Sequence, residues 1–302
     1  MTRRVYCSDA ARLRGDDNAA TAARVDVWIL VELPSTWGRD PLTDAAIPHA
    51  VRESLVNASI AIPRNRVVFI RRRVECVGPT RVYIVRSAPV AGILAAFDLA
   101  TIDEVADVPF GAIALREPAV PAQPLVLVCT HGQHDSCCGR RGYPLYDALR
   151  DREDLDVWQC SHIGGDRFAA NAVVLPWGLY YGPVEPRDAD LLADSIARDE
   201  ILLPAYRGRS SLSRPVQAAD IHVRRILNLT PRDALRFVDR TALGDNLTRV
   251  QLRERNGTLH DVTIEYYAAS EPVRPSCLAT KANAIRQFRV VEYRASLGTT
   301  SP

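Results

Sequence analysis

The chain has 302 residues, of which 47% are hydrophobic and 25% charged, so it can bury a substantial core and form two or three domains. Its 38 basic and 36 acidic residues leave a net charge of +2, which excludes a strong overall attraction to nucleic acid or to an anionic membrane. The sequence has no apolar stretch of about 18 residues and no secretory signal, so we expect a cytoplasmic protein.

The first 22 residues are polar and are expected to form a flexible terminus. The next region, 23–117, contains apolar runs of strand length that end at proline or glycine. They predict strands at 25–33, 66–73 and 81–87 and a helix at 48–58, in the order β-α-β-β.

The same order returns in region 118–209, after a linker rich in proline. We expect strands at 124–129 and 155–160, a helix at 144–151, two short strands around Trp177, and a helix that begins at Pro186. The two regions therefore resemble an internal repeat, and only the second has a cysteine-rich loop after its first strand. This order predicts an α/β fold with two related thioredoxin-like halves.

The last region, 210–302, departs from this pattern. We expect helices at 216–229 and 231–243, a hairpin around Asn256 and Gly257, and a final strand in RQFRVVEY. These elements predict a small α+β region whose role the sequence does not reveal.

Seven cysteines are too few and too unevenly spaced for a disulfide framework in a chain of this length. Four of them are crowded into the middle of the chain, namely Cys129, Cys137, Cys138 and Cys160. Such crowding indicates metal or redox chemistry. The other three are interpreted as structural or incidental, namely Cys7, Cys76 and Cys277.

The crowded cysteines lie in two loops, 129–139 and 160–168, and each loop directly follows a predicted strand. Both loops also contain histidine. If the two strands are parallel neighbours, thiols and imidazoles meet at one edge of the sheet, which is typical of a soft metal or cluster site. Gly164 and Gly165 would let the backbone approach such a group closely.

The motifs CTHGQHDSCCGRRGYPLYDALR and VWQCSHIGGDRFAANAVVLPWGLYYGPV resemble the sucrase/ferredoxin-like family, whose cluster domain is similar to thioredoxin-like ferredoxins. Weaker similarity in WILVELPSTWG and YRGRSSLSRPVQAA extends the resemblance over residues 25 to about 220. It implies a [2Fe–2S] cluster bound by two ligands from each loop.

The resemblance assigns Cys129 and Cys138 to the first pair of ligands. The second pair is Cys-x3-Cys in thioredoxin-like ferredoxins and His-x3-His in fungal relatives of the family. His162 and Asp166 occupy those positions here. Because aspartate is an uncommon cluster ligand, this sequence departs from the family's ligand pattern at one of the four positions.

Cys160 is the predicted substitute, which makes the expected cofactor ligands Cys129, Cys138, Cys160 and His162. Three alternatives remain open. Cys137 could replace Cys138, Asp166 could complete the set, or two Cys-x-His units, Cys129/His131 and Cys160/His162, could form a Rieske-like site.

The predicted function is one-electron transfer between donor and acceptor proteins that the sequence does not identify. An electron carrier is favoured over an enzyme with its own substrate. The alternatives are a thiol–disulfide redox protein, which usually has a Cys-x-x-Cys motif that this chain lacks, or a structural zinc module. No acidic motif indicates a glycosidase, and no nucleotide-binding fingerprint is present.

Overall fold

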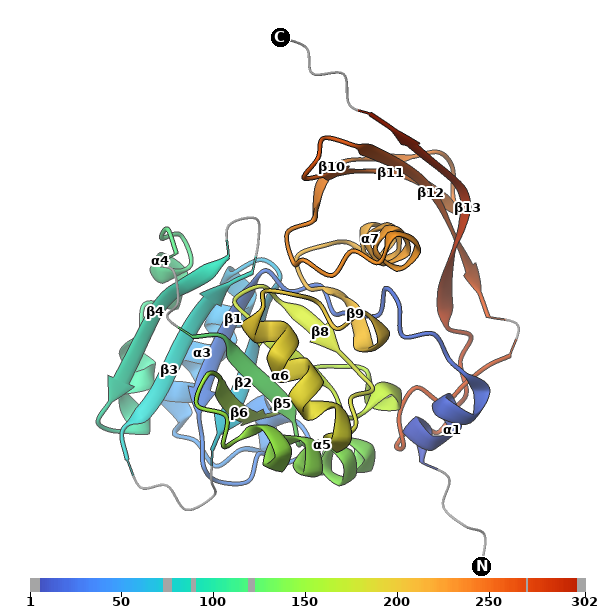
Figure 1. Ribbon diagram of the computed structural model, residues 1–302. Helices are drawn as coiled ribbons and strands as arrows, with labels where there is room; N and C mark the ends of the chain where they lie inside the picture. Colours follow the sequence, from blue (N-terminus) through green and yellow to red (C-terminus); the bar gives the residue numbers. More distant parts are fainter. Residues whose placement is uncertain (1–5, 73–77, 88–90, 119–122, 270, 298–302) are drawn as a thin grey trace, which may run out of the picture.

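The computed structural model describes residues 6–72, 78–87, 91–118, 123–269 and 271–297. Its strands form a nine-stranded sheet, β1 to β9, and a separate four-stranded sheet, β10 to β13 (Figure 1). The prediction of an α/β fold followed by a small C-terminal α+β region is confirmed. None of the helices in these described parts has the length and hydropathy needed to cross a bilayer.

The first half of the large sheet has the strand order β4-β3-β1-β2. Its elements are β1 (Val27–Glu32), α2 (Pro41–Asp44), α3 (His49–Ala61), β2 (Asn65–Arg71), β3 (Thr80–Arg86), β4 (Gly92–Leu99) and α4 (Phe110–Ile113). β1 and β2 are parallel, whereas β3 and β4 join as antiparallel neighbours. β4 was not predicted, and it extends this half to four strands.

The second half repeats this arrangement in the order β6-β5-β7-β8, with β9 added at the edge. Its elements are β5 (Leu125–Cys129), α5 (Ser136–Leu149), β6 (Asp156–Cys160), β7 (Ala172–Leu175), β8 (Leu179–Tyr181), α6 (Ala189–Ala197) and β9 (Tyr206–Arg209). β5 and β6 are parallel, and β7 and β8 are antiparallel. This is the thioredoxin-like strand order, and both halves share it.

The two halves meet where β2 pairs antiparallel with the end of β6. Their inner faces share one hydrophobic core, in which Trp28 contacts Tyr180 and Tyr83 contacts Trp158, with ring centroids 6.1 and 6.2 Å apart. Cys129 belongs to this core. The candidate site therefore lies at the junction of the halves.

Helix α5 begins eight residues earlier than predicted, at Ser136 instead of Pro144. The carboxylate of Asp135 accepts a hydrogen bond from the backbone N–H of Cys137 at 2.8 Å and caps the helix. Pro144 lies inside the helix rather than at its start. The start at Ser136 places Cys137 and Cys138 in the first helical turn.

Two further predictions are wrong. Residues 7–14, expected within a flexible terminus, form helix α1 (Cys7–Arg14), which buries Cys7, Ser8 and Ala11. Part of the stretch 231–243, expected as a helix, forms β10 (Leu235–Ala242), because it pairs along its length with β11.

The C-terminal region consists of one helix against one curved sheet (Figure 1). Its elements are α7 (Arg214–Leu227), β10, β11 (Leu247–Glu254), β12 (Leu259–Ala268) and β13 (Arg286–Ser296). Val216, Ala219 and Val223 of α7 pack against the apolar face of β11 and β12. The predicted hairpin and final strand are present as β11, β12 and β13.

Candidate functional site

The ends of β5 and β6 bring the two predicted loops together. The strands are parallel and in register, so that Cys129 lies opposite Cys160. The N–H of Thr130 then donates to the carbonyl of Cys160 at 3.2 Å, which holds the first residues of both loops side by side. The expectation that parallel neighbouring strands present these loops at one edge is met.

Two thiols and an imidazole converge at this edge. The Sγ atoms of Cys129 and Cys138 and a ring nitrogen of His162 all lie within 4.8 Å of one another. Both cysteines are buried, at 1% exposure, whereas the side chain of His162 is 18% exposed. The group thus combines soft donors inside the protein with an imidazole near its surface.

Asp166 lies against the same group. Its Oδ1 accepts a hydrogen bond from the thiol of Cys138 at 3.2 Å and lies 3.1 Å from Nδ1 of His162. Asp166 also forms a second group of donor atoms with His134 and His162, again within 4.8 Å. Asp166, which stands where the family pattern has Cys or His, therefore contacts two members of the first group.

Hydrogen bonds from Cys138 and Cys160 lower the pKa of Cys129 well below its usual value, against the opposing effect of burial. Burial alone would lower the pKa of His162, but its contacts with Asp166 and Cys129 raise that pKa to about 9. The site therefore stabilises a thiolate at Cys129, which is the form that binds metal.

Cys160, the predicted fourth ligand, lies beside Cys129 at the end of the neighbouring strand. Its side chain is fully buried, and burial raises its pKa. It contacts Cys129 but is not part of the group that Cys129, Cys138 and His162 form. Cys160 lies on the core side of the site.

His131 orients the second loop. Its Nδ1 accepts the backbone N–H of His162 at 3.2 Å, so its Nε2 carries the proton and donates to the carbonyl of Gly38 at 2.6 Å. The ring also meets the edge of Trp37, with centroids 5.6 Å apart. The Rieske-like alternative needs a ring nitrogen of His131 as a ligand. Because backbone groups engage both of these nitrogens, the arrangement does not support that alternative.

The first half of the chain contributes to the site, a role that sequence reasoning did not identify. Its segment with Trp37, Gly38 and Arg39 contacts His131 and His134, and Arg66 donates to the carbonyl of His162 at 3.0 Å. The weak motif similarity in WILVELPSTWG was the only signal in the sequence that pointed to this segment.

A family model described as sucrase/ferredoxin-like matches residues 19–208, which include both halves of the large sheet and the whole group of donors. The chain belongs to the sucrase/ferredoxin-like family. The match ends before α7 and the C-terminal sheet.

Several curated proteins that are similar to this chain carry the name "Altered inheritance of mitochondria protein 32". The protein from Debaryomyces hansenii is 36% identical over 95 residues, which are 28% of this chain and 35% of that protein. The protein from Eremothecium gossypii is 32% identical over 114 residues, or 32% of this chain and 36% of that protein. The chain thus matches about a third of the length of these relatives.

Solved structures with similarity include a thioredoxin-like [2Fe–2S] ferredoxin from Aquifex aeolicus. It is 19% identical, with a TM-score of 0.25, and the match covers 28% of this chain and 91% of that ferredoxin. A variant of the same ferredoxin gives 20% identity and a TM-score of 0.26 over 28% of this chain and 99% of that one. We assign the fold from the strand order described above, not from these low TM-scores.

A cavity of about 530 Å³ opens beside the imidazole side of the site. Arg39, Leu42 and Arg66 from the first half line it together with His134 and His162 from the second. The ring of His134 stacks on that of His162, with centroids 3.8 Å apart. The two imidazoles therefore connect the buried thiols to an accessible hollow.

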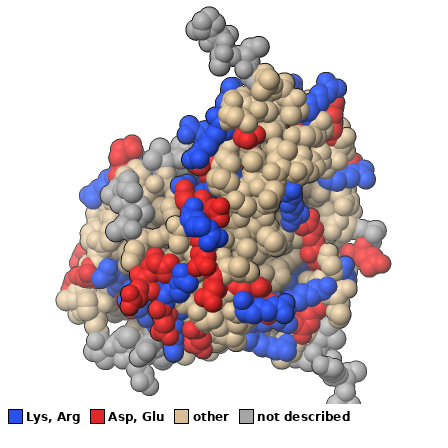
Figure 2. Space-filling model, in the orientation of Figure 1, with Lys and Arg blue, Asp and Glu red and all other residues tan. Residues whose placement is uncertain are grey.

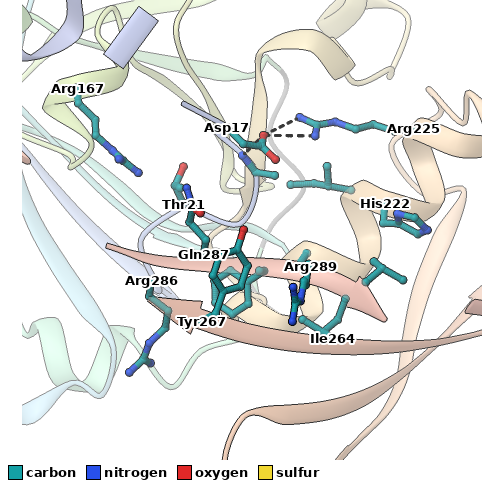
Figure 3. Close-up of a pocket in the computed structure, with 15 residues that line it drawn as sticks. Asp17, Thr21, Arg167, His222, Arg225, Ile264, Tyr267, Arg286, Gln287 and Arg289 are labelled. Carbon is teal, nitrogen blue, oxygen red and sulfur yellow. Dashed lines mark hydrogen bonds and ion pairs between the residues drawn. The ribbon is translucent and has the colours of Figure 1, made fainter. Parts of the chain in front are cut away.

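A second cavity, of about 220 Å³, lies between α7, the strands β12 and β13 and the segment before β1 (Figure 3). Arg225 pairs there with Asp17 at 3.4 Å, and Arg289 pairs with Glu265 at 2.6 Å. None of its lining residues is a cysteine. We therefore place the candidate site at the thiols of Cys129 and Cys138, not in this cavity.

Replacing Gly142 by alanine is expected to destabilise the site, since a Cβ there would lie 2.0 Å from the carbonyl oxygen of Cys129. Helix α5 would have to move away from β5, and overpacking of this kind costs about 1 to 3 kcal/mol. Thermal unfolding monitored by circular dichroism would show a lower midpoint. Gly111→Ala is the control, because a Cβ at Gly111 meets no atom within 4 Å. Equal midpoints for the two variants would contradict this packing.

The structure also places two of the remaining cysteines together. Cys7 and Cys277, expected to be structural or incidental, lie beside Cys137 and Asp135 in a second compact group. Cys137 therefore belongs to a different group from its neighbour Cys138, and it is not placed to replace Cys138 as a ligand. Cys76 lies outside the described residues.

Proposed function

We propose that this protein carries a [2Fe–2S] cluster and transfers single electrons. The observation that supports this most directly is the convergence of Cys129, Cys138 and His162 at the ends of two parallel strands. Thiolates hold such clusters, and histidine replaces two of them in Rieske centres. Membership of the sucrase/ferredoxin-like family points the same way.

The donor set fits the cluster. Cys129, Cys138 and His162 would supply three ligands, and we propose Asp166 as the fourth because its carboxylate contacts both Cys138 and His162. Cys160, the fourth ligand that the sequence predicted, is the competing assignment. Its thiol is soft, but it adjoins Cys129 alone among the proposed ligands.

When bound, the cluster would supply a one-electron redox couple. The protein's own residues would shield its thiolate side, because Cys129 and Cys138 are buried in the core that the two halves share. His162, stacked on His134, lies beside an accessible cavity and would be the side on which a redox partner approaches. A neutral imidazole in place of a thiolate raises the reduction potential above that of an all-cysteine ferredoxin.

On the face shown in Figure 2, the described acidic and basic side chains are interspersed and form no broad patch of one sign. Cytoplasmic location stays a prediction.

The test is a visible and EPR spectrum of the anaerobically purified protein before and after dithionite, with iron and sulfide measured on the same sample. We expect absorption that bleaches on reduction and a one-electron EPR signal. Asp166→Ala should lose most of the iron, whereas Cys160→Ala should keep it. The reverse result would assign the fourth ligand to Cys160.

A wild-type protein that binds no iron after anaerobic reconstitution would contradict the cluster itself. Zinc held by Cys129 and Cys138 would instead support the structural zinc module. A reversible disulfide between these two cysteines would support the thiol–disulfide alternative. Both outcomes are read on the same sample, by metal analysis and by mass spectrometry of alkylated peptides.

A further inference from the structure

Three thiols and a carboxylate from distant parts of the chain meet in a second group, separate from the cluster ligands. Cys7 comes from α1, Cys137 from the first turn of α5, Asp135 from the cap of that helix, and Cys277 from the connection between β12 and β13. Figure 1 shows this connection running back from the C-terminal sheet to α1. One donor atom from each residue lies within 4.8 Å of all the others.

The distances match those around one tetrahedral ion. Sγ of Cys7 is 3.6 Å from Sγ of Cys137 and 3.6 Å from Sγ of Cys277, and the last two atoms are 3.3 Å apart. Zinc–sulfur bonds of about 2.3 Å in a tetrahedron place the sulfurs about 3.8 Å from one another. A disulfide requires about 2.05 Å, far less than any of these separations.

Asp135 completes the donor set. Its carboxylate oxygens lie 3.9 and 4.0 Å from Sγ of Cys7, and they accept the backbone N–H groups of Cys137 at 2.8 Å and of Cys277 at 2.6 Å. These hydrogen bonds fix the carboxylate between the two cysteines. Asp135 thus orients both Cys137 and Cys277.

The charge of Asp135 also favours a cation at this group. Its side chain is fully buried, and no Lys, Arg or His in the described parts of the chain forms an ion pair with it. The nearby Arg140 and Arg141 pair with Asp9 instead. A buried carboxylate without a positive partner is costly, and a divalent cation at this point would supply the missing charge.

A supporting layer surrounds the thiols. The hydroxyl of Ser8 donates to Sγ of Cys137 at 3.1 Å, and Nε of Arg141 donates to the hydroxyl of Ser8 at 3.1 Å. Hydrogen bonds of this kind orient ligands and offset the negative charge of thiolates in metal sites.

We propose that Cys7, Asp135, Cys137 and Cys277 form a structural Zn²⁺ site. Thiolate is a soft ligand that selects zinc over Mg²⁺ or Ca²⁺, and a closed set of four protein donors leaves no position for a substrate. The ion would tie α1 and the β12–β13 connection to the start of α5, the helix that also carries Cys138. The site does not depend on the cluster, because the two groups share no residue.

The test uses the full chain, purified anaerobically under reducing conditions and titrated with Co²⁺ and then Zn²⁺. Four-coordinate Co²⁺ with thiolate ligands gives intense ligand-to-metal and d–d absorption, which Zn²⁺ should abolish. We expect about one zinc per chain at this site, and Cys277→Ser should weaken zinc binding by about tenfold or more while leaving bound iron unchanged. Asp135→Asn, which retains an oxygen to cap α5, should also weaken it.

Cys138→Ser is the control, because it should retain this zinc, whereas zinc bound in place of the cluster would be lost from it. Three results would overturn the proposal. One is the absence of tetrahedral cobalt bands in the wild-type protein, which does not depend on the folding of any variant. The others are unchanged zinc affinity in both Cys7→Ser and Cys277→Ser, and a disulfide among the three cysteines in the anaerobic protein.

Discussion

Replacing Cys138 by serine is expected to remove the visible absorption of the protein and to lower its bound iron by more than about tenfold. Cys138 adjoins Cys129, His162 and Asp166, so its loss takes away one of the two thiolates of the proposed cluster. Serine keeps the size of the side chain but is a poor ligand for iron. Iron, sulfide and the absorption spectrum, measured per chain after anaerobic purification, provide the readout.

Cys137→Ser is the matched control, because the two cysteines are adjacent and equally buried at 1% exposure. Cys137 lies with Cys7 and Cys277 instead of the cluster ligands, so this variant should keep its iron and colour and lose zinc. If Cys137→Ser loses the iron and Cys138→Ser keeps it, the assignment of these cysteines to the two groups is reversed.

Replacing Arg224 by methionine is expected to lower the free energy of unfolding by about 3 to 5 kcal/mol, as breaking a buried ion pair does. Arg224 is fully buried on α7, where Nε donates to both carboxylate oxygens of Asp220 at 3.1 Å. Its other nitrogens donate to the carbonyls of Leu229, Pro231 and Arg232. Methionine would leave a buried carboxylate and three carbonyls without these donors.

Arg225→Met is the control for this change. Arg225 is the next residue on the same helix, but its side chain is 40% exposed and pairs with the more exposed Asp17. An exposed pair of this kind contributes less than about 1 kcal/mol. Urea unfolding monitored by circular dichroism at constant metal loading measures both variants, and equal losses of stability would mean that Arg224 does not anchor α7.

The strands of both halves could be predicted because each central strand is an apolar run with turn residues at its ends. Edge elements could not be recognised in this way. The stretch 231–243 has apolar residues at helical spacing, yet Leu235–Ala242 is a strand because β11 offers it a partner. The start of α5 was missed because it depends on a side-chain cap at Asp135 rather than on the conspicuous Pro144.

The candidate site was also predictable only in part. Parallel pairing of the strands that precede the two loops was enough to predict that Cys129 and His162 meet, since both loops leave one edge of the sheet. The choice between Asp166 and Cys160 was beyond the sequence. The contact of Asp166 with Cys138 depends on the intervening turn at Gly164 and Gly165, which both have positive φ.

By itself, the sequence determined the family, the α/β class and the two loops that carry the candidate ligands, because these features are encoded in local patterns of strand, loop and motif. Only the tertiary structure decided that Cys7 and Cys277 meet Cys137. These thiols are separated by up to 270 positions along the chain. Contacts of that range arise from the packing of whole elements, here α1 and the β12–β13 connection against α5, and leave no trace in the spacing of the cysteines.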